Sequence, residues 1–209
     1  MTGRLLEGQV ALVTGAGRGL GRALAGRLAA LGCAVGVHGR RETGPAEYGE
    51  GTTLTATAAE IAETHGVRTL PVLGDLTDGT AVEGVLARVV DALGALDIVV
   101  HNAGGDIAAA GGKPDPNDAV YVKEVDIRAV LDRNLLSTIL VGRAAAQAMI
   151  PRGRGRILMV SSTAAFIGRE HASIYATAKA GAVHYTRCLA TELRRYNITV
   201  NSLAPGDTR

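Results

Sequence analysis

Cysteine is scarce in this sequence, and spacings typical of metal ligands are missing from it. Cys33 and Cys188 are the two cysteines, and neither belongs to a CxxC pair or a Cys/His ligand pattern. Ligand spacing is also missing among the five histidines, which are His38, His65, His101, His171 and His184. We therefore predict two buried free thiols in a reduced cytosol, structural or surface histidines, and no catalytic metal.

Long apolar runs and concentrated charge are missing as well. No stretch is apolar for long enough to cross a membrane, and the first apolar run begins near Gln9, which leaves no room for a signal peptide. The net charge is only +2, and the densest basic group, Arg152, Arg154 and Arg156, alternates with glycines as in a solvated loop. These features argue against a nucleic-acid or membrane partner and predict a soluble cytoplasmic protein.

The sequence does contain a regular alternation of short β-branched runs and longer Ala/Leu-rich segments. Its 209 residues, of which 47% are hydrophobic, suit a single domain over residues 1–209. We expect strands over residues 10–13, 34–38, 68–73, 96–100, 156–160 and 198–203. We expect helices over residues 20–31, 53–65, 80–93, 125–149 and 174–195. This order predicts an α/β fold, a doubly wound parallel sheet with helices on both faces.

A glycine-rich segment, residues 14–21, follows the first predicted strand and opens the first predicted helix. Gly15 permits a tight turn, and the later glycines let the backbone approach a pyrophosphate and let the helix pack on the sheet. The free N–H groups and positive dipole end of the helix favour an anion there. We therefore predict dinucleotide binding by Gly15, Gly17, Arg18, Gly19, Leu20 and Gly21.

The spacing Thr14-Gly15-x-x-x-Gly19-x-Gly21 resembles that of the short-chain dehydrogenase/reductase family. Further matches occur in the family's order along essentially the whole chain. They are Asp75, Asn102-Ala103-Gly104, Asn134, Ser162, Tyr175-x-x-x-Lys179 and Pro205-Gly206. The resemblance implies a Rossmann fold with strand order 3-2-1-4-5-6. Two features depart from the family pattern. His101 stands where Asn is common, and the chain stops at Arg209, so the seventh strand and the substrate lid are expected to be missing.

The expected chemistry is hydride transfer, which the cofactor carries, coupled to a proton transfer that the protein supplies. Tyr175 is the candidate acid and base, and a free phenol has a pKa near 10. Lys179 lies one helical turn on, so we expect its charge to lower that pKa. The resemblance implies that Lys179 also binds the nicotinamide ribose and that Ser162 hydrogen-bonds the substrate oxygen. It further implies that Asn134 holds a water that relays protons to Lys179.

Several residues at strand ends are expected to contact the rest of the cofactor. Asp75 is expected to bind the adenine with Leu76 beside the ring, although Asp75 could instead cap the turn before Thr77. The resemblance places Asn102, Ala103 and Gly104 along the ribose and central cofactor, with Pro205, Gly206 and Thr208 near the nicotinamide.

The cofactor preference depends on the end of the second strand. NAD-specific sites place an acidic residue there to bind the ribose 2′-hydroxyl. Gly39 stands at that position, Arg40 follows it, and Arg18 lies in the nearby turn. Two guanidinium groups suit a 2′-phosphate, so we favour NADP(H), with NAD(H) as the alternative if both arginines are solvated.

The sequence thus predicts an oxidoreductase that interconverts a carbonyl and a secondary alcohol on a small molecule. Open alternatives are a 3-oxoacyl-thioester reductase acting on acyl carrier protein, an NAD-dependent sugar or polyol dehydrogenase, an enzyme acting on cyclic or aromatic ketones, and a non-catalytic dinucleotide sensor. The polar loop 104–119 favours a hydroxylated substrate. Small residues on the two long helices predict a homo-oligomer, a tetramer or dimer; they are Ala144, Ala145, Ala146, Ala148, Ala178, Ala180, Gly181 and Ala182.

Overall fold

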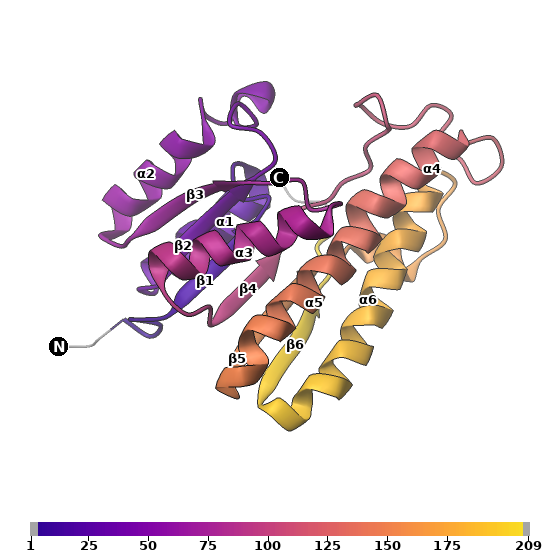
Figure 1. Cartoon of the computed structure of the whole chain (residues 1–209). Helices are drawn as coiled ribbons and strands as arrows, with labels where there is room; N and C mark the ends of the chain where they lie inside the picture. The colour runs from indigo at the N-terminus through magenta and orange to yellow at the C-terminus, as the bar shows by residue number, and fades with distance from the viewer. Residues whose placement is uncertain (1–3, 207–209) are drawn as a thin grey trace.

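The computed structural model describes residues 4–206 as one parallel sheet covered by helices (Figure 1). The six strands lie in the order β3-β2-β1-β4-β5-β6, which confirms the predicted fold class and strand order. Their bounds are β1 Val10–Thr14, β2 Ala34–Gly39, β3 Thr69–Leu73, β4 Ile98–His101, β5 Gly155–Val160 and β6 Ile198–Leu203. All five neighbouring pairs are parallel, so the carboxyl ends of the strands meet at one edge.

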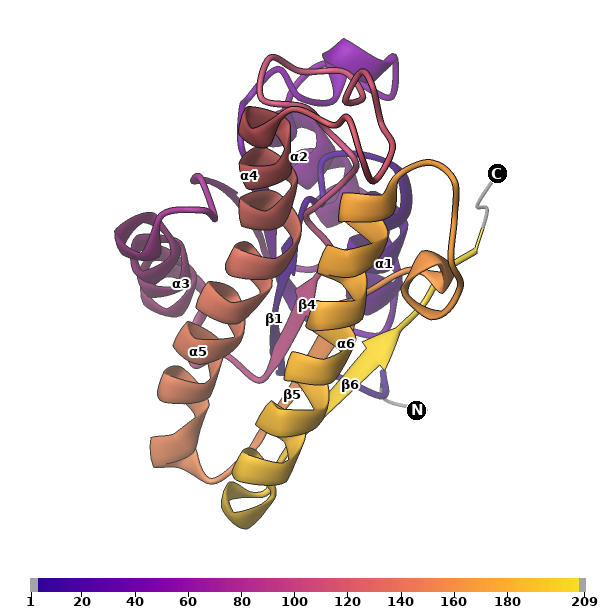
Figure 2. The same ribbon diagram turned by 90° about the vertical axis from the view of Figure 1, so that its right-hand side faces the viewer.

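Helices cover both faces of this sheet because its central strands are apolar on both sides. In β1, Val10 and Leu12 pack into one core cluster, while Ala11 and Val13 pack into the other. Helices α1 (Gly19–Ala30) and α2 (Leu54–His65) cover the second face. Helices α3 (Gly79–Leu93), α5 (Ser137–Met149) and α6 (Ser173–Leu193) cover the first. Both ribbon views place α5 and α6 side by side (Figures 1 and 2).

The predicted long helix over residues 125–149 is interrupted in the structure. Helix α4 (Glu124–Leu131) leads into a π-helical turn, Asp132–Leu136, and α5 follows. Side-chain hydroxyls bond to carbonyls in this turn: Ser137 donates to the carbonyl of Arg133 at 2.7 Å, and Thr138 to that of Asn134 at 2.6 Å. A π-turn inserts one residue and re-aims the side chains after it, which helical periodicity in the sequence does not reveal.

Two other expectations about single residues were wrong. Cys188 is exposed, whereas Cys33 is buried as predicted. Arg152 does not lie in a solvated loop, because its guanidinium donates to the carbonyl of Leu96 at 2.7 Å and to Asp97 at 2.8 Å. Asp97, directly before β4, also accepts from the amide of Val10 at 3.0 Å, so it links the start of β1 to the short helix Ile150–Arg152 that precedes β5.

Among residues 4–206, no helix combines the length and apolar character needed to cross a membrane. Within the same residues, no group of three or more His, Cys, Asp and Glu side chains is arranged to hold a metal ion.

Candidate active site

A cleft of about 680 Å³ lies at the carboxyl ends of the central strands. The glycine turn after β1 forms its floor, and the segments after β2, β3 and β4 form its walls. Eleven of the predicted cofactor residues line it, namely Gly15, Gly17, Arg18, Gly19, Leu20, Arg40, Asp75, Leu76, Asn102, Ala103 and Gly104. Residues 39–41 and 74–77 stand together here because β2 and β3 are neighbours in the sheet.

The remaining predicted residues lie elsewhere. Gly21 is buried in the first turn of α1, away from the cleft lining. Pro205 lies beside the start of the segment after β5, since its carbonyl accepts from the amide of Thr163 at 3.0 Å. Gly206 follows it at the end of the described chain, and Thr208 lies outside the described residues.

Hydrogen bonds from β4 hold the glycine turn in place. The Thr14 hydroxyl oxygen accepts from the amides of Asn102 at 3.0 Å and Ala103 at 3.1 Å. The side-chain amide of Asn102 donates to the carbonyl of Gly15 at 3.2 Å. Gly15 has φ +62°, and a Cβ there would lie 2.9 Å from Cα of Ala103, so this position requires glycine.

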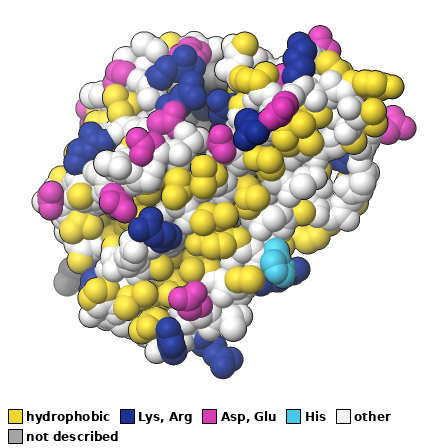
Figure 3. All heavy atoms as spheres, turned by 45° about the vertical axis from the view of Figure 1, so that its right-hand side comes forward, with side chains coloured by type: hydrophobic (Ala, Val, Ile, Leu, Met, Phe, Trp, Pro, Cys, Tyr) yellow, Lys and Arg dark blue, Asp and Glu magenta, His cyan; other side chains and the backbone are white. Residues whose placement is uncertain are grey.

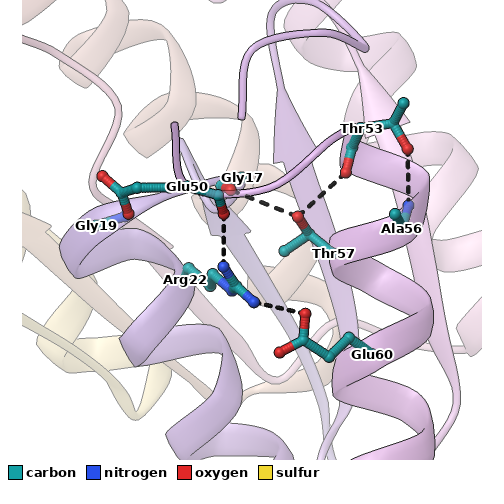
Figure 4. Close-up of polar contacts among 8 residues, drawn as sticks. All are labelled: Gly17, Gly19, Arg22, Glu50, Thr53, Ala56, Thr57 and Glu60. Atoms are coloured by element: carbon teal, nitrogen blue, oxygen red, sulfur yellow. Dashed lines mark hydrogen bonds and ion pairs between the residues drawn. The ribbon is translucent and has the colours of Figure 1, made fainter. Parts of the chain in front are cut away.

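The Glu50 side chain, on the loop over residues 40–53, places its carboxylate at the N-terminus of α1 (Figure 4). Glu50 accepts from the amide of Gly19 at 2.5 Å, and its own carbonyl accepts from Arg22 at 2.7 Å. Arg22 also donates to Glu60 on α2 at 2.5 Å. Sequence reasoning missed this contact, which uses an N–H group that a bound anion would otherwise receive.

Cationic side chains also line the cleft. Arg18 and Arg40 both belong to its wall, and Arg41 forms an ion pair with Glu47 at 2.6 Å. Strand β2 ends at Gly39, so no carboxylate stands at the position where NAD-specific sites carry one.

Asp75 adopts the turn-capping arrangement that was the alternative to adenine binding. Its Oδ1 accepts from the Thr77 amide at 3.0 Å and from the Thr77 hydroxyl at 2.7 Å. Burial acts to raise the pKa of Asp75, but these hydrogen bonds and the nearby Arg40 charge outweigh it and lower the pKa. Asp75 is therefore a carboxylate at neutral pH on the wall of the cleft.

The fold brings Ser162, Tyr175 and Lys179 together next to this cleft. Tyr175 and Lys179 lie on α6, and the ammonium nitrogen of Lys179 is 5.7 Å from the centroid of the Tyr175 ring. Lys179 donates to the carbonyl of Val160 at the end of β5 at 2.9 Å. Ser162 caps the short helix Thr163–Phe166, and its hydroxyl is near enough to Tyr175 to act on the pKa of the phenol.

The pKa values of this pair differ from expectation. Burial raises the pKa of Tyr175, and the charge of Asp106 adds to this, whereas the hydrogen bond with Ser162 lowers it. Burial also lowers the pKa of Lys179 to about 8, so Lys179 is charged at neutral pH. Because burial outweighs the contributions that lower its pKa, Tyr175 is a protonated phenol in this structure, and the predicted net lowering of its pKa was wrong.

Asn134 is fully buried in the π-turn and pins the loop that follows β4. Its Oδ1 accepts from the amide of Gly105 at 2.9 Å, and its Nδ2 donates to the carbonyls of Gly105 at 2.8 Å and Val130 at 2.9 Å. Gly104 has φ +153°, and a Cβ there would lie 2.7 Å from Oδ1 of Asn134 and 3.2 Å from Nζ of Lys179. Three motifs that are distant in sequence are therefore in contact.

The family model described as short chain dehydrogenase matches residues 9–209. The chain belongs to this family. It is an oxidoreductase of the short-chain dehydrogenase type, and the family binds NAD(P)(H) and acts on CH–OH groups.

Three similar proteins illustrate how broad this family is. The chain is 34% identical over 203 residues to a 3-oxoacyl-acyl-carrier-protein reductase of Aquifex aeolicus, covering 96% of this chain and 74% of the relative. It is 37% identical over 209 residues to cyclohexanol dehydrogenase of a Rhodococcus species, with the same coverage. The structure of NAD⁺-bound xylitol dehydrogenase superposes with a TM-score of 0.83 at 31% identity, covering 96% of this chain and 71% of that one.

Proposed function

We propose that this chain interconverts a carbonyl and a secondary alcohol on a small molecule, with NADP(H) as cofactor and Tyr175 as the general acid and base. The convergence of Ser162, Tyr175, Lys179 and Asn134 beside the cleft carries this proposal. When bound, the nicotinamide cofactor supplies or accepts the hydride. The residues present fit it, because the glycine turn after β1 lines the cleft together with the cationic side chains of Arg18 and Arg40.

The protein's own residues handle the proton. In the reductive direction the Ser162 hydroxyl donates to the substrate carbonyl and holds it beside the Tyr175 phenol. Tyr175 then gives its proton to the developing alkoxide, and the raised pKa of Tyr175 ensures that this proton is present at neutral pH. The charged Lys179, whose ammonium nitrogen is 5.7 Å from the ring centroid, stabilises the phenolate that remains. Asn134 completes the proposed path for reprotonation by holding a water toward Lys179.

The proposed role of Tyr175 is tested by replacing it with phenylalanine. Tyr175→Phe is expected to lower kcat by about 10²–10⁴-fold while NADPH still binds, because only the proton donor is lost. Tyr185→Phe is the matched control, since the Tyr185 hydroxyl donates to the carbonyl of Ile139 outside the cleft. Near-normal turnover in Tyr175→Phe would refute the role assigned to Tyr175.

The preference for NADP(H) rests on Arg18 and Arg40 in the cleft wall and on Gly39 at the end of β2. Arg40→Ala is expected to weaken NADPH at least about tenfold more than NADH, because only NADPH carries the 2′-phosphate. Arg143→Ala on α5 removes the same charge from a remote surface and is the control. A wild-type preference for NADH would reject the proposal in favour of the NAD(H) alternative.

For the substrate we propose a hydroxylated compound in preference to an acyl thioester. Asp106, on the loop after β4, accepts from the Asn117 side chain at 2.6 Å, and its charge acts on Tyr175. Its other oxygen, Oδ1, is buried without a hydrogen-bond partner among the described residues. A carboxylate with an unused acceptor near the proton donor suits a substrate hydroxyl.

Steady-state kinetics on a substrate panel tests this choice. With xylitol, cyclohexanol and a 3-oxoacyl thioester as probes, xylitol is expected to give the highest kcat/KM. Asp106→Asn is expected to raise KM for xylitol and leave KM for cyclohexanol unchanged. Higher kcat/KM with the thioester would support the 3-oxoacyl-reductase alternative instead.

Assembly is proposed to involve the outer faces of α5 and α6, as a dimer or tetramer. Much of the alanine surface predicted for this contact was assigned wrongly: five of these residues are buried within the chain itself, namely Ala144, Ala145, Ala146, Ala178 and Ala182. Ala148 and Gly181 are half-buried and Ala180 is exposed. Apolar side chains spread widely over this side of the molecule (Figure 3). Light scattering at micromolar concentration tests the proposal, and a monomer would contradict it.

The cytoplasm remains the proposed location, because both cysteines are free thiols, as in a reducing compartment.

A further inference from the structure

Two buried histidines flank the end of β1, and the proposed proton transfer uses neither of them. His38 lies on β2 and is 2% exposed, and His101 lies on β4 and is 1% exposed. Since β1 is between β2 and β4, the two imidazoles reach the start of the glycine turn from opposite sides. His101 is paired in register with Thr14, the last residue of β1.

The hydrogen bonds of Thr14 fix the protonation state of His101. The Thr14 oxygen already accepts from two backbone amides, those of Asn102 and Ala103. Both of its lone pairs are used, so its hydrogen is donated to Nδ1 of His101, 2.9 Å away. Nε2 of His101 then carries the ring hydrogen and faces the hydroxyl oxygen of Ser137 at 3.4 Å. Ser137 in turn donates to the carbonyl of Arg133 at 2.7 Å.

His38 has the same tautomer for a simpler reason. The amide of Gly15 lies 3.3 Å from Nδ1 of His38, and a backbone amide can only donate. Nδ1 is therefore an acceptor, and Nε2 donates its hydrogen to the carbonyl of Gly74 at 3.1 Å. Each ring thus offers an unprotonated Nδ1 to the turn and a protonated Nε2 to a neighbouring segment.

The surroundings keep both rings neutral. Burial lowers the pKa of His38 to about 4; Arg88 on α3 lowers it further, while the Gly74 carbonyl and Asp75 oppose the shift. Burial lowers the pKa of His101 to about 3, and Lys179 on α6 and His38 itself add to this. A proton on either Nδ1 would face a hydrogen-bond donor of the turn, so the charged forms do not fit.

We propose that His38 and His101 are positioning residues that set the conformation of the nucleotide-binding turn, each through the lone pair on its Nδ1. Both rings also connect the turn to the cleft walls, His38 to Gly74 after β3 and His101 to the π-turn through Ser137. The inference rests on the proposed function only in that the turn binds a nicotinamide nucleotide.

Matched substitutions distinguish the effect of the Nδ1 hydrogen-bond acceptor from the effect of the volume of each ring. His38→Leu and His101→Leu fill the space without an acceptor, whereas His38→Asn and His101→Asn place an amide oxygen close to where Nδ1 was. The expected result is a rise in the NADPH Kd of about three- to tenfold for each Leu variant and recovery of most of it in the Asn variant. KM for NADPH should rise with Kd, while kcat at saturating NADPH stays near that of the wild type.

Nitrogen NMR of the wild-type protein tests the tautomers directly and does not require any variant to fold. Long-range proton–nitrogen correlations are expected to find Nδ1 unprotonated and Nε2 protonated in both rings at pH 5.5, where an ordinary histidine is charged. A protonated Nδ1, or Leu variants that bind NADPH as the wild type does, would overturn the inference. So would Asn variants that bind no better than the Leu variants. Failure of wild-type protein to bind either nucleotide would instead overturn the proposed function and leave the tautomer result standing.

Discussion

Replacing Gly21 with alanine tests how closely α1 approaches the nucleotide-binding turn. Gly21 lies in the first turn of the helix, where its backbone is helical and alanine is conformationally acceptable. A Cβ at this position would lie 2.0 Å from the carbonyl oxygen of Gly15 and 2.6 Å from Nδ2 of Asn102. Because ordinary contacts of a Cβ begin at 3.4 Å, the helix and the turn would have to separate by roughly 1.4 Å.

The expected cost follows from this separation. Overpacking of a well-packed site costs about 1–3 kcal/mol, and loss of the Asn102–Gly15 hydrogen bond adds about 0.5–1.5 kcal/mol. Alanine in place of a helical glycine returns only about 0.5–1 kcal/mol. We therefore expect Gly21→Ala to lower the free energy of unfolding by about 0.5–4 kcal/mol. Displacement of the turn is also expected to raise the NADPH Kd at least about tenfold.

Gly84→Ala is the matched control. Gly84 lies within α3, and a Cβ there meets nothing within 4 Å, so this variant gains the helical advantage without a clash. Urea unfolding and NADPH fluorescence titration on the two variants give the comparison. If Gly21→Ala were as stable as Gly84→Ala and bound NADPH like the wild type, the close approach of helix and turn would be refuted.

Three further perturbations address charged groups. Lys179 loses its proton near pH 8 in the folded protein but near its ordinary pKa of 10.5 when unfolded. Between these pH values Lys179 binds more protons in the unfolded chain, so the free energy of unfolding of the wild type should rise relative to that of Lys179→Met from pH 8 toward 10.5 in urea unfolding. The raised pKa of Cys33 gives the opposite slope, but it does so in both proteins. Glu50→Gln removes a negative charge from the N-terminus of α1 and should tighten NADPH binding about two- to fivefold. Glu60→Gln is the control, because Glu60 contacts Arg22 and not the N-terminus of the helix, and it should change NADPH binding little. Weaker binding in Glu50→Gln would contradict the assigned contact. Asp97→Asn should lower the free energy of unfolding by about 1–3 kcal/mol in urea, because Asp97 is 7% exposed and pairs with Arg152, and an unchanged unfolding midpoint would count against this.

The local pattern of the sequence identified the family and most of the cleft. Apolar runs and their spacing located all six strands to within two residues at either end, because doubly covered strands must be apolar along their whole length. The glycine turn was recognisable because its glycines follow a short fixed spacing between the first strand and the first helix. Strand order then brought the predicted cofactor residues to one edge.

Contacts between distant segments were not readable in the same way. His38 and His101 are 63 positions apart in sequence, and they approach the turn only because β2 and β4 both pair with β1. The hydrogen bond between the Gly19 amide and the Glu50 carboxylate depends on the conformation of a loop whose sequence has no regular periodicity.

The sequence by itself determined the order of strands and helices, the glycine turn, and the identity of Ser162, Tyr175 and Lys179 as candidates, since each is encoded by residues close together or by a short fixed spacing. The tertiary structure decided which hydrogens these groups carry. Burial, which no single stretch of sequence expresses, keeps Tyr175 a neutral phenol and both histidines neutral acceptors. Protonation state follows from the packing of all neighbouring elements around a group, and only the folded chain supplies that packing.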